Sequence, residues 1–250
     1  MLVEIQNKGG KLCSPAKEGK LRCPLMVRTT SEDVVTDHLF STLRCINPTW
    51  WLPDLLNQGL GQQRFHRQIF RNLKIKLWVK QRQVPKWLVP WNEGQTEVDV
   101  VITWSNPSTM VFIEMKYGSP IAKSTANAES NGKYPADQII RNIRIGLWKC
   151  GLFHEKELFT SPPTRFLMLL IAPKVGNQFI QKYRTESGIR KALPKGELLK
   201  ELPQTPIVGE ASYRQIIKIL KANHRFLSRS EKTLAKELCN YLEFKSNQLK

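Results

Sequence analysis

CxxC pairs, clustered histidines and long apolar runs are all missing from this sequence of 250 residues. Its five cysteines form no CxxC pair and its four histidines are widely spaced, which argues against a disulfide framework, a structural zinc site and a histidine-based nuclease. The longest apolar run, Phe166 to Pro173, is less than half of a membrane span. These absences predict a protein of the reducing cytoplasm that does not enter a membrane.

Acidic residues are scarce relative to basic ones. Lys and Arg number 39 against 21 Asp and Glu, which gives a net charge of +18. Such a basic chain is expected to bind a polyanion, nucleic acid before membrane. Hydrophobic residues at 41% and charged residues at 24% match ordinary globular usage, so the chain is expected to build a core. A merely basic surface without a polyanionic partner is the alternative.

No acid occurs between Leu55 and Asn92. This stretch holds a predicted strand over 73–79 and three tryptophans, and basic residues interleaved with aromatics suit phosphate contacts and base stacking. A solvated strand face with its tryptophans in the core explains the pattern equally well. The candidate nucleic-acid-binding residues of this stretch are Arg64, Arg67, Arg71, Lys74, Lys76 and Lys80.

Hydrophobic periodicity predicts an α/β (α+β) chain. A helix is expected from the cap at Ser31 towards Arg44, and a second one over 135–148. Strands are expected over 73–79, 96–104, 110–117 and 165–172. We therefore expect three parts of the chain: a basic arm or irregular lead-in over 1–28, a core over 29–175, and a helical C-terminal extension packed on that core over 176–250.

The two central strands carry facing acids if they form a hairpin around the turn 105–108. Trp104 then pairs with Thr109, and Asp99 lies opposite Glu114. Two facing carboxylates repel each other at a cost of about 0.2–1 kcal/mol. A divalent cation between them is the simplest compensation.

Lys116 follows Glu114 by two residues and shares its face of the predicted hairpin. From there its ammonium group could orient or deprotonate a water and steady developing negative charge. An ordinary surface ion pair between Glu97 and Lys116, with both acids solvated, is the alternative.

The segments EVDVVI at 97–102 and VFIEMKY at 111–117 resemble the PD-(D/E)xK nuclease superfamily, with Val98 in place of its proline. The resemblance implies a restriction-endonuclease-like core with the order α-β-β-β-α-β, a mixed central sheet flanked by helices. It covers the chain from Ser31 to Ala172.

The resemblance also implies roles for individual residues. Asp99 and Glu114 would bind Mg²⁺, for which Mn²⁺ substitutes, and Glu32 would complete the metal site. Lys116 would act on the attacking water. The candidate residues on the second helix are Gln138 in the active site, with Arg141 and Asn142 reaching towards substrate phosphates.

The function implied is a Mg²⁺-dependent nuclease, with DNA expected before RNA. It would be an endonuclease of a restriction, defence, repair or mobile-element system. A non-catalytic nucleic-acid-binding protein or subunit on the same fold is the alternative, although facing carboxylates would repel the phosphate backbone it has to bind. A homodimer, or a partner subunit held through the C-terminal helices, is a further expectation.

Overall fold

The computed structural model describes residues 31–122, 134–154, 164–203 and 205–248. The predicted basic arm over 1–28 and most of the loop over 118–133 lie outside this part of the chain. Five strands form one mixed sheet in the order β1-β2-β3-β4-β5, in which β1, β2 and β3 are antiparallel and β4 and β5 run parallel to β3. The strands are β1 Arg71–Gln81, β2 Thr96–Ser105, β3 Thr109–Met115, β4 Arg165–Ala172 and β5 Val208–Ser212.

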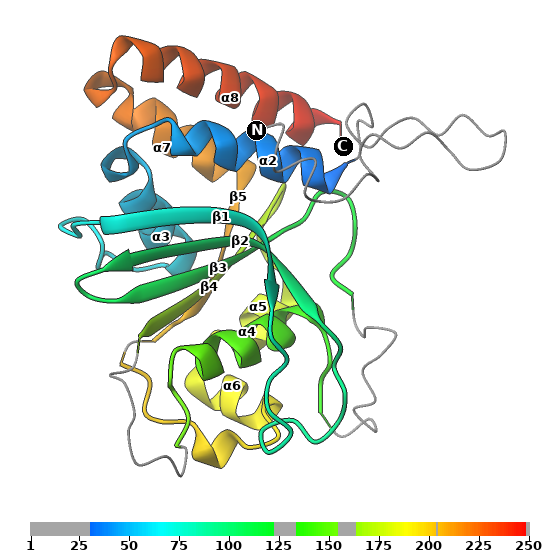
Figure 1. The fold of residues 1–250 in the computed structure, drawn as a ribbon. Helices are drawn as coiled ribbons and strands as arrows, with labels where there is room; N and C mark the ends of the chain where they lie inside the picture. Colours follow the sequence, from blue (N-terminus) through cyan, green and yellow to red (C-terminus); the bar gives the residue numbers. More distant parts are fainter. Residues whose placement is uncertain (1–30, 123–133, 155–163, 204, 249–250) are drawn as a thin grey trace, which may run out of the picture.

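Helices cover both faces of the sheet (Figure 1). One face carries α2 Glu32–Arg44, α3 Leu52–Leu60, α7 Tyr213–Asn223 and α8 Arg229–Asn247. The other face carries α4 Gln138–Lys149, α5 Gln178–Tyr183 and α6 Glu186–Ala192. In the part of the chain that the structure describes, three short 3₁₀ turns complete the elements: η2 Pro48–Trp50, η3 Gly196–Leu198 and η4 His224–Phe226. The prediction of a mixed sheet flanked by helices is therefore confirmed.

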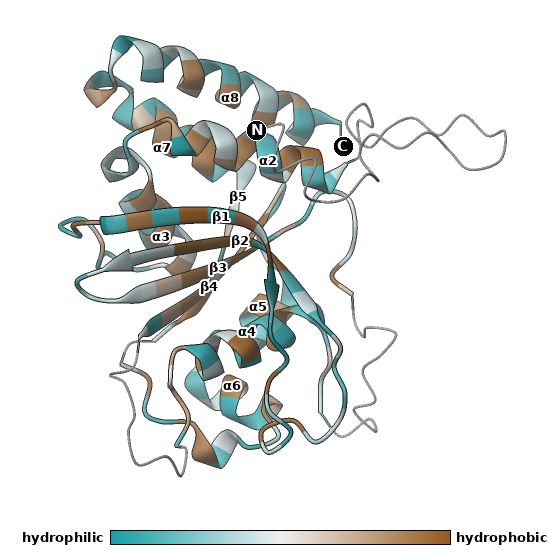
Figure 2. Cartoon of the chain, viewed as in Figure 1, coloured by the Kyte–Doolittle hydropathy of each residue, from teal (hydrophilic) through white to brown (hydrophobic). Residues whose placement is uncertain are grey.

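The hairpin of β2 and β3 follows the predicted register, since Trp104 pairs with Thr109 and Val100 with Ile113. Its predicted apolar face is buried, and its seven side chains are at most 3% exposed: Val98, Val100, Ile102, Trp104, Val111, Ile113 and Met115. Figure 2 shows the contrast between these central strands, which are largely hydrophobic, and the edge strand β1, which alternates along its length.

Two predicted boundaries are corrected by hydrogen bonds. Helix α4 begins at Gln138 rather than at Pro135, because the Asp137 side chain caps it by accepting from the backbone N–H of Ile140, 3.0 Å away. Strand β3 ends at Met115 rather than at Tyr117, because the Tyr117 backbone N–H donates to a side chain of α2 instead of to a strand.

The segment predicted as a helical extension also contributes β5, which lies beside β4 in the sheet. The packing of helix α3 explains why the sequence of β5 lacks a pattern that predicts a strand. A Cβ on Gly209 of β5 would come 2.2 Å from the backbone oxygen of Gly59 on α3, so this strand needs a glycine where a branched residue is usual. Among the described residues, no helix has the length and apolar character needed to cross a membrane.

Candidate metal centre

Three carboxylates from distant parts of the chain meet at one end of the sheet. Glu32 is the first residue of α2, which begins there because the Ser31 side chain caps the helix. Asp99 lies on β2 and Glu114 on β3. One oxygen from each of the three lies within 4.8 Å of the others. Glu114 is fully buried, while Glu32 and Asp99 are partly exposed.

Asp99 sits where the paired part of the β2–β3 hairpin ends, one residue beyond the Val100 and Ile113 pair. Its Oδ2 accepts a hydrogen bond from the backbone N–H of Met115, at 2.8 Å. The carboxylate is therefore fixed against β3, next to Glu114. The sequence-predicted juxtaposition of the two acids is present in the structure.

Backbone strain lies next to Asp99 on the neighbouring strand. Trp78 of β1 occupies the position between the Leu77–Val100 and Val79–Val98 pairs, and its φ is 49°. A non-glycine residue in this left-handed region costs about 1–3 kcal/mol, and such strain persists where the surroundings over-determine it. Here the strained residue lies opposite Asp99, whose carboxylate accepts a hydrogen bond from the β3 backbone.

Lys116 joins the acids. Its Nζ lies 2.9 Å from Glu32 Oε1 and 3.0 Å from Glu114 Oε1, and its side chain is only 11% exposed. The expected alternative, a surface pair of Lys116 with Glu97, is therefore not formed, and Glu97 lies opposite Lys80 instead. The predicted set of Asp99, Glu114 and Lys116, together with Glu32, forms one cluster.

Burial and charge set the protonation of this cluster. Burial, followed by repulsion from Asp99, raises the pKa of Glu114 to about 8, although the charge of Lys116 acts in the opposite direction. Burial opposes the charged form of Lys116, but the Glu114 and Glu32 carboxylates outweigh it and raise the pKa of the ammonium. Lys116 is thus a cation at neutral pH, whereas the raised pKa favours the protonated form of Glu114.

Several groups hold the cluster in place. The second oxygen of Glu32 accepts from the Tyr117 backbone N–H at 3.0 Å and from the Ser119 hydroxyl at 2.7 Å. The Tyr213 hydroxyl of α7 donates to the backbone oxygen of Lys116 at 2.8 Å. Sequence reasoning missed Ser119 and Tyr213, because one lies in a polar loop and the other on an apolar helical stripe, and only the tertiary structure brings them here.

The residues predicted on α4 occupy different places. Asn142 is fully buried and its Nδ2 donates to Glu114 Oε2 at 3.0 Å, so it supports the carboxylate cluster from inside rather than reaching for a phosphate. Arg141 is also buried and donates to the Glu93 backbone oxygen and the Thr96 hydroxyl. Gln138 is the first residue of α4 and half-buried. The α4 amide in contact with a site carboxylate is therefore that of Asn142.

The predicted nucleic-acid-binding residues on and before β1 are all exposed: Arg64, Arg67, Arg71, Lys74, Lys76 and Lys80. Lys74, Lys76 and Lys80 pair with Thr103, Val101 and Glu97. Alternate residues of a strand share one sheet face, so these three lysines share the face of Asp99. Trp78, between them, is buried.

No protein-family model, curated protein or solved structure matches the chain. Its geometry defines a mixed α/β protein with three carboxylates and one lysine gathered at the end of a central hairpin.

Proposed function

We propose that the chain is a Mg²⁺-dependent nuclease that hydrolyses phosphodiester bonds, with DNA favoured over RNA, and that it acts as an endonuclease in a restriction, defence, repair or mobile-element system. The observation that carries this proposal is the cluster itself. Three carboxylate oxygens lie within 4.8 Å of one another, and one lysine contacts two of the three residues. An arrangement that leaves like charges so close is costly without a cation.

The order of elements supports the fold proposed with this function. Helix α2, strands β1, β2 and β3, helix α4 and strand β4 occur in this order along the chain, with η2 and helix α3 inserted between α2 and β1. Apart from that insertion, this is the α-β-β-β-α-β order of the restriction-endonuclease-like core, which we propose for residues 31–172. The acids lie on the second and third strands of that order, and Glu32 lies on its first helix.

The donor set fits a hard divalent cation. Carboxylate oxygens are the ligands that Mg²⁺ prefers, and the three carboxylates, when all are ionised, would leave a formal charge of −2 with the one ammonium. Asp99, Glu114 and Glu32 would hold the ion. When bound, Mg²⁺ supplies Lewis-acid stabilisation and lowers the pKa of a coordinated water.

The protein side chains supply the rest of the chemistry. Lys116 carries a positive charge, so it offers hydrogen bonds to the attacking water and to an oxygen of the scissile phosphate, where negative charge develops. Asn142 holds the Glu114 carboxylate at its second oxygen. Glu32 keeps the Lys116 ammonium in place. The exposed Lys74, Lys76 and Lys80 would contact phosphates further along the strand.

A cleavage assay tests the proposal. Plasmid and linear DNA, single-stranded and duplex, are incubated with Mg²⁺, with Mn²⁺ or with EDTA. We expect metal-dependent cutting by the wild type, and a loss of at least about 10³-fold in Asp99→Ala and Lys116→Ala, because each removes a charge from the reacting centre. The contrast between plasmid and linear DNA separates endonuclease from exonuclease action.

Matched controls come from exposed residues of the C-terminal helices. Glu237→Ala and Lys218→Ala remove the same types of charge far from the cluster in sequence and should cut as the wild type does. Full activity in Lys116→Ala would contradict the mechanism. Tight, salt-sensitive DNA binding with no cutting in any metal would instead favour the non-catalytic binding protein.

A further inference from the structure

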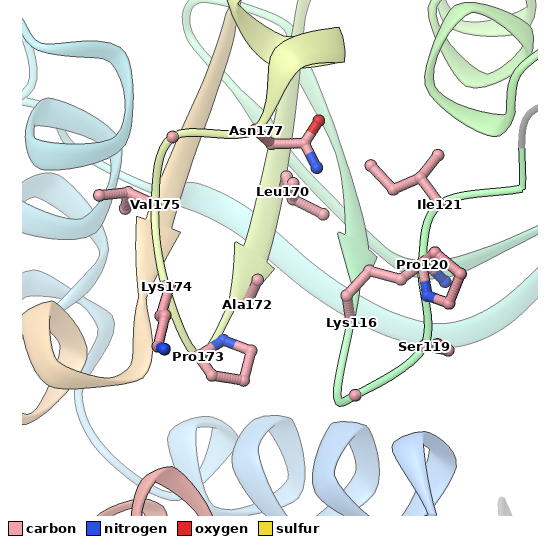
Figure 3. Close-up of a pocket in the computed structure, with 12 residues that line it drawn as sticks. Lys116, Ser119, Pro120, Ile121, Leu170, Ala172, Pro173, Lys174, Val175 and Asn177 are labelled. Atoms are coloured by element: carbon pink, nitrogen blue, oxygen red, sulfur yellow. The ribbon is translucent and has the colours of Figure 1, made fainter. Parts of the chain in front are cut away.

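A cavity of about 600 Å³ opens beside Lys116, at the carboxyl ends of β3 and β4 (Figure 3). Leu170 and Ala172 of β4 line its floor. One wall is the segment 118–121, which follows β3, and the other is the segment 173–177, which follows β4. Its volume lies within the range of about 300–1,000 Å³ that is typical of small-ligand sites.

The cavity continues directly from the metal centre. Glu114 and Leu170 are partners in the β3–β4 register, so they lie side by side on one face of the sheet. Lys116 belongs both to the cluster and to the cavity lining. A group in the cavity would therefore neighbour a phosphate held at the carboxylates.

The lining combines an apolar interior with polar groups that suit a nucleotide. Leu170, Ala172 and Ile121 supply apolar surface, and the exposed Lys174 lies at the rim. The Oδ1 atom of Asn177 accepts from the Phe179 backbone N–H at 2.9 Å. Its amide side chain faces Ile121 across the cavity (Figure 3), which leaves Nδ2 as a donor towards the interior.

Hydrogen bonds within the protein hold the wall formed by residues 173–177 in position. The Glu210 carboxylate of β5 accepts from the backbone N–H groups of Gly176 at 2.8 Å and Asn177 at 3.0 Å. Gly176 has a φ of 100°, a conformation that side chains disfavour, and this turn leads the wall back towards α5. This wall is thus preformed, which lowers the cost of ordering it on binding.

We propose that this cavity binds one unpaired nucleotide of the strand being cut, next to the scissile phosphate, with Lys174 on a neighbouring phosphate and Asn177 on the base. The inference rests on the proposed function and names its substrate class. A nucleotide within a perfect duplex has to leave its stack before it enters such a cavity. Strands with an unpaired nucleotide at the cut should therefore bind better than a perfect duplex.

Fluorescence anisotropy in EDTA, where nothing is cut, measures this directly with a labelled DNA oligonucleotide, single-stranded or annealed to its complement. We expect the wild type to bind the single strand about tenfold more tightly than the duplex.

Ala172→Leu fills the floor of the cavity and should weaken single-strand binding about tenfold. Lys174→Gln should reduce the salt dependence by about one phosphate contact, a slope change of about 0.7. Lys191→Gln, an exposed lysine on α6, is the matched control and should change neither.

Thermal unfolding checks that Ala172→Leu folds, and Lys174→Glu at the exposed rim is the second variant if it does not. Equal wild-type affinity for single strand and duplex, or unchanged binding in both cavity variants, would overturn the inference. Parallel cleavage assays keep this failure apart from that of the proposed function. Cutting that depends on Asp99 but not on the cavity contradicts only the inference. Cavity-dependent binding without any cutting contradicts the nuclease, and leaves the cavity as a nucleotide site without a scissile phosphate beside it.

Discussion

Helix α4 borders two charged clusters that differ in their balance of charge. Asn142 contacts the carboxylate cluster of Glu32, Asp99 and Glu114, whereas Arg141 and Arg144 belong to a second cluster with Glu93 and Asp137, here called the arginine cluster. The arginine cluster has two cations and two acids. The carboxylate cluster has three acids and one cation, Lys116.

The partners of the two clusters differ in the same way. Arg144 is fully buried, forms an ion pair with Glu93 and donates to the Pro135 backbone oxygen at 2.8 Å. Asp137 accepts from the Tyr183 hydroxyl at 2.5 Å. These contacts tie the loop before β2, the start of α4 and helix α5 together. The arginine cluster, whose charges balance, joins these parts of the fold, whereas the acids of the carboxylate cluster outnumber its one cation.

The largest expected effect is a loss of cleavage activity when an acid of the carboxylate cluster is replaced. Glu114→Gln removes one of the excess acids, so we expect metal-dependent cleavage to fall by at least about 10³-fold. Because the change also relieves repulsion with Asp99, the metal-free protein should be no less stable than the wild type. Cleavage rates and urea unfolding measure the two effects on the same preparation.

The second effect is a loss of protein stability when a cation of the arginine cluster is replaced. Arg144→Ala leaves Glu93 buried without its cation, and we expect the free energy of unfolding to fall by about 3–5 kcal/mol. Urea unfolding measures it, with the exposed Arg214→Ala on α7 as the control that should stay close to the wild type. A loss below about 1 kcal/mol in Arg144→Ala would contradict the structural role.

A pH dependence follows from Glu114. Its pKa is raised from 4.5 to about 8 in the folded protein, so the folded state keeps a proton that the unfolded state has released. In EDTA this contribution to stability is present below about pH 4.5 and is lost as the pH rises towards 8. Urea unfolding across this range should show the decline in the wild type, and a flatter profile in Glu114→Gln.

A smaller effect is expected from the support of Glu32. Ser119→Ala removes one hydrogen bond to its carboxylate, a change of about 1 kcal/mol, so cleavage should fall about fivefold. Mn²⁺ affinity should stay within about twofold, since the ligands remain. A loss of metal binding as large as that of Glu114→Gln would contradict this limited role, because Ser119 supports only one of the three carboxylates.

The smallest effect concerns the lysines of β1. Lys76→Gln should weaken binding of duplex DNA slightly and reduce its salt dependence by about one contact, a slope change of about 0.9. Cleavage at saturating DNA should not change, because Lys76 is not among the residues of the metal centre. An unchanged salt dependence would remove β1 from the binding surface.

The sequence was sufficient to predict the central hairpin, whose pattern is local. Alternation in β2 and β3 and the turn between them fix the register, so the approach of Asp99 and Glu114 and the position of Lys116 could be predicted. Strand β5 could not be predicted, because the close approach of α3 requires a glycine at Gly209, where strands usually have a branched residue.

Long-range partners were equally out of reach. Arg141 looks like a phosphate contact in a basic helix, yet it is buried against Glu93 and Thr96, which precede it by more than forty residues. Asn142 was expected at the substrate and instead supports Glu114. Such contacts depend on how α4 packs on the sheet, and no local sequence pattern around these residues predicts them.

The most direct measurement of the central claim is the thermal unfolding midpoint at increasing Mn²⁺, for the wild type, Glu114→Gln and the exposed control Glu237→Gln. An ion that binds only the folded state raises the midpoint with its concentration. We predict a rise in the wild type and the control that is absent in Glu114→Gln. An equal rise in all three proteins, or no rise in the wild type, would show that these carboxylates do not form a metal centre.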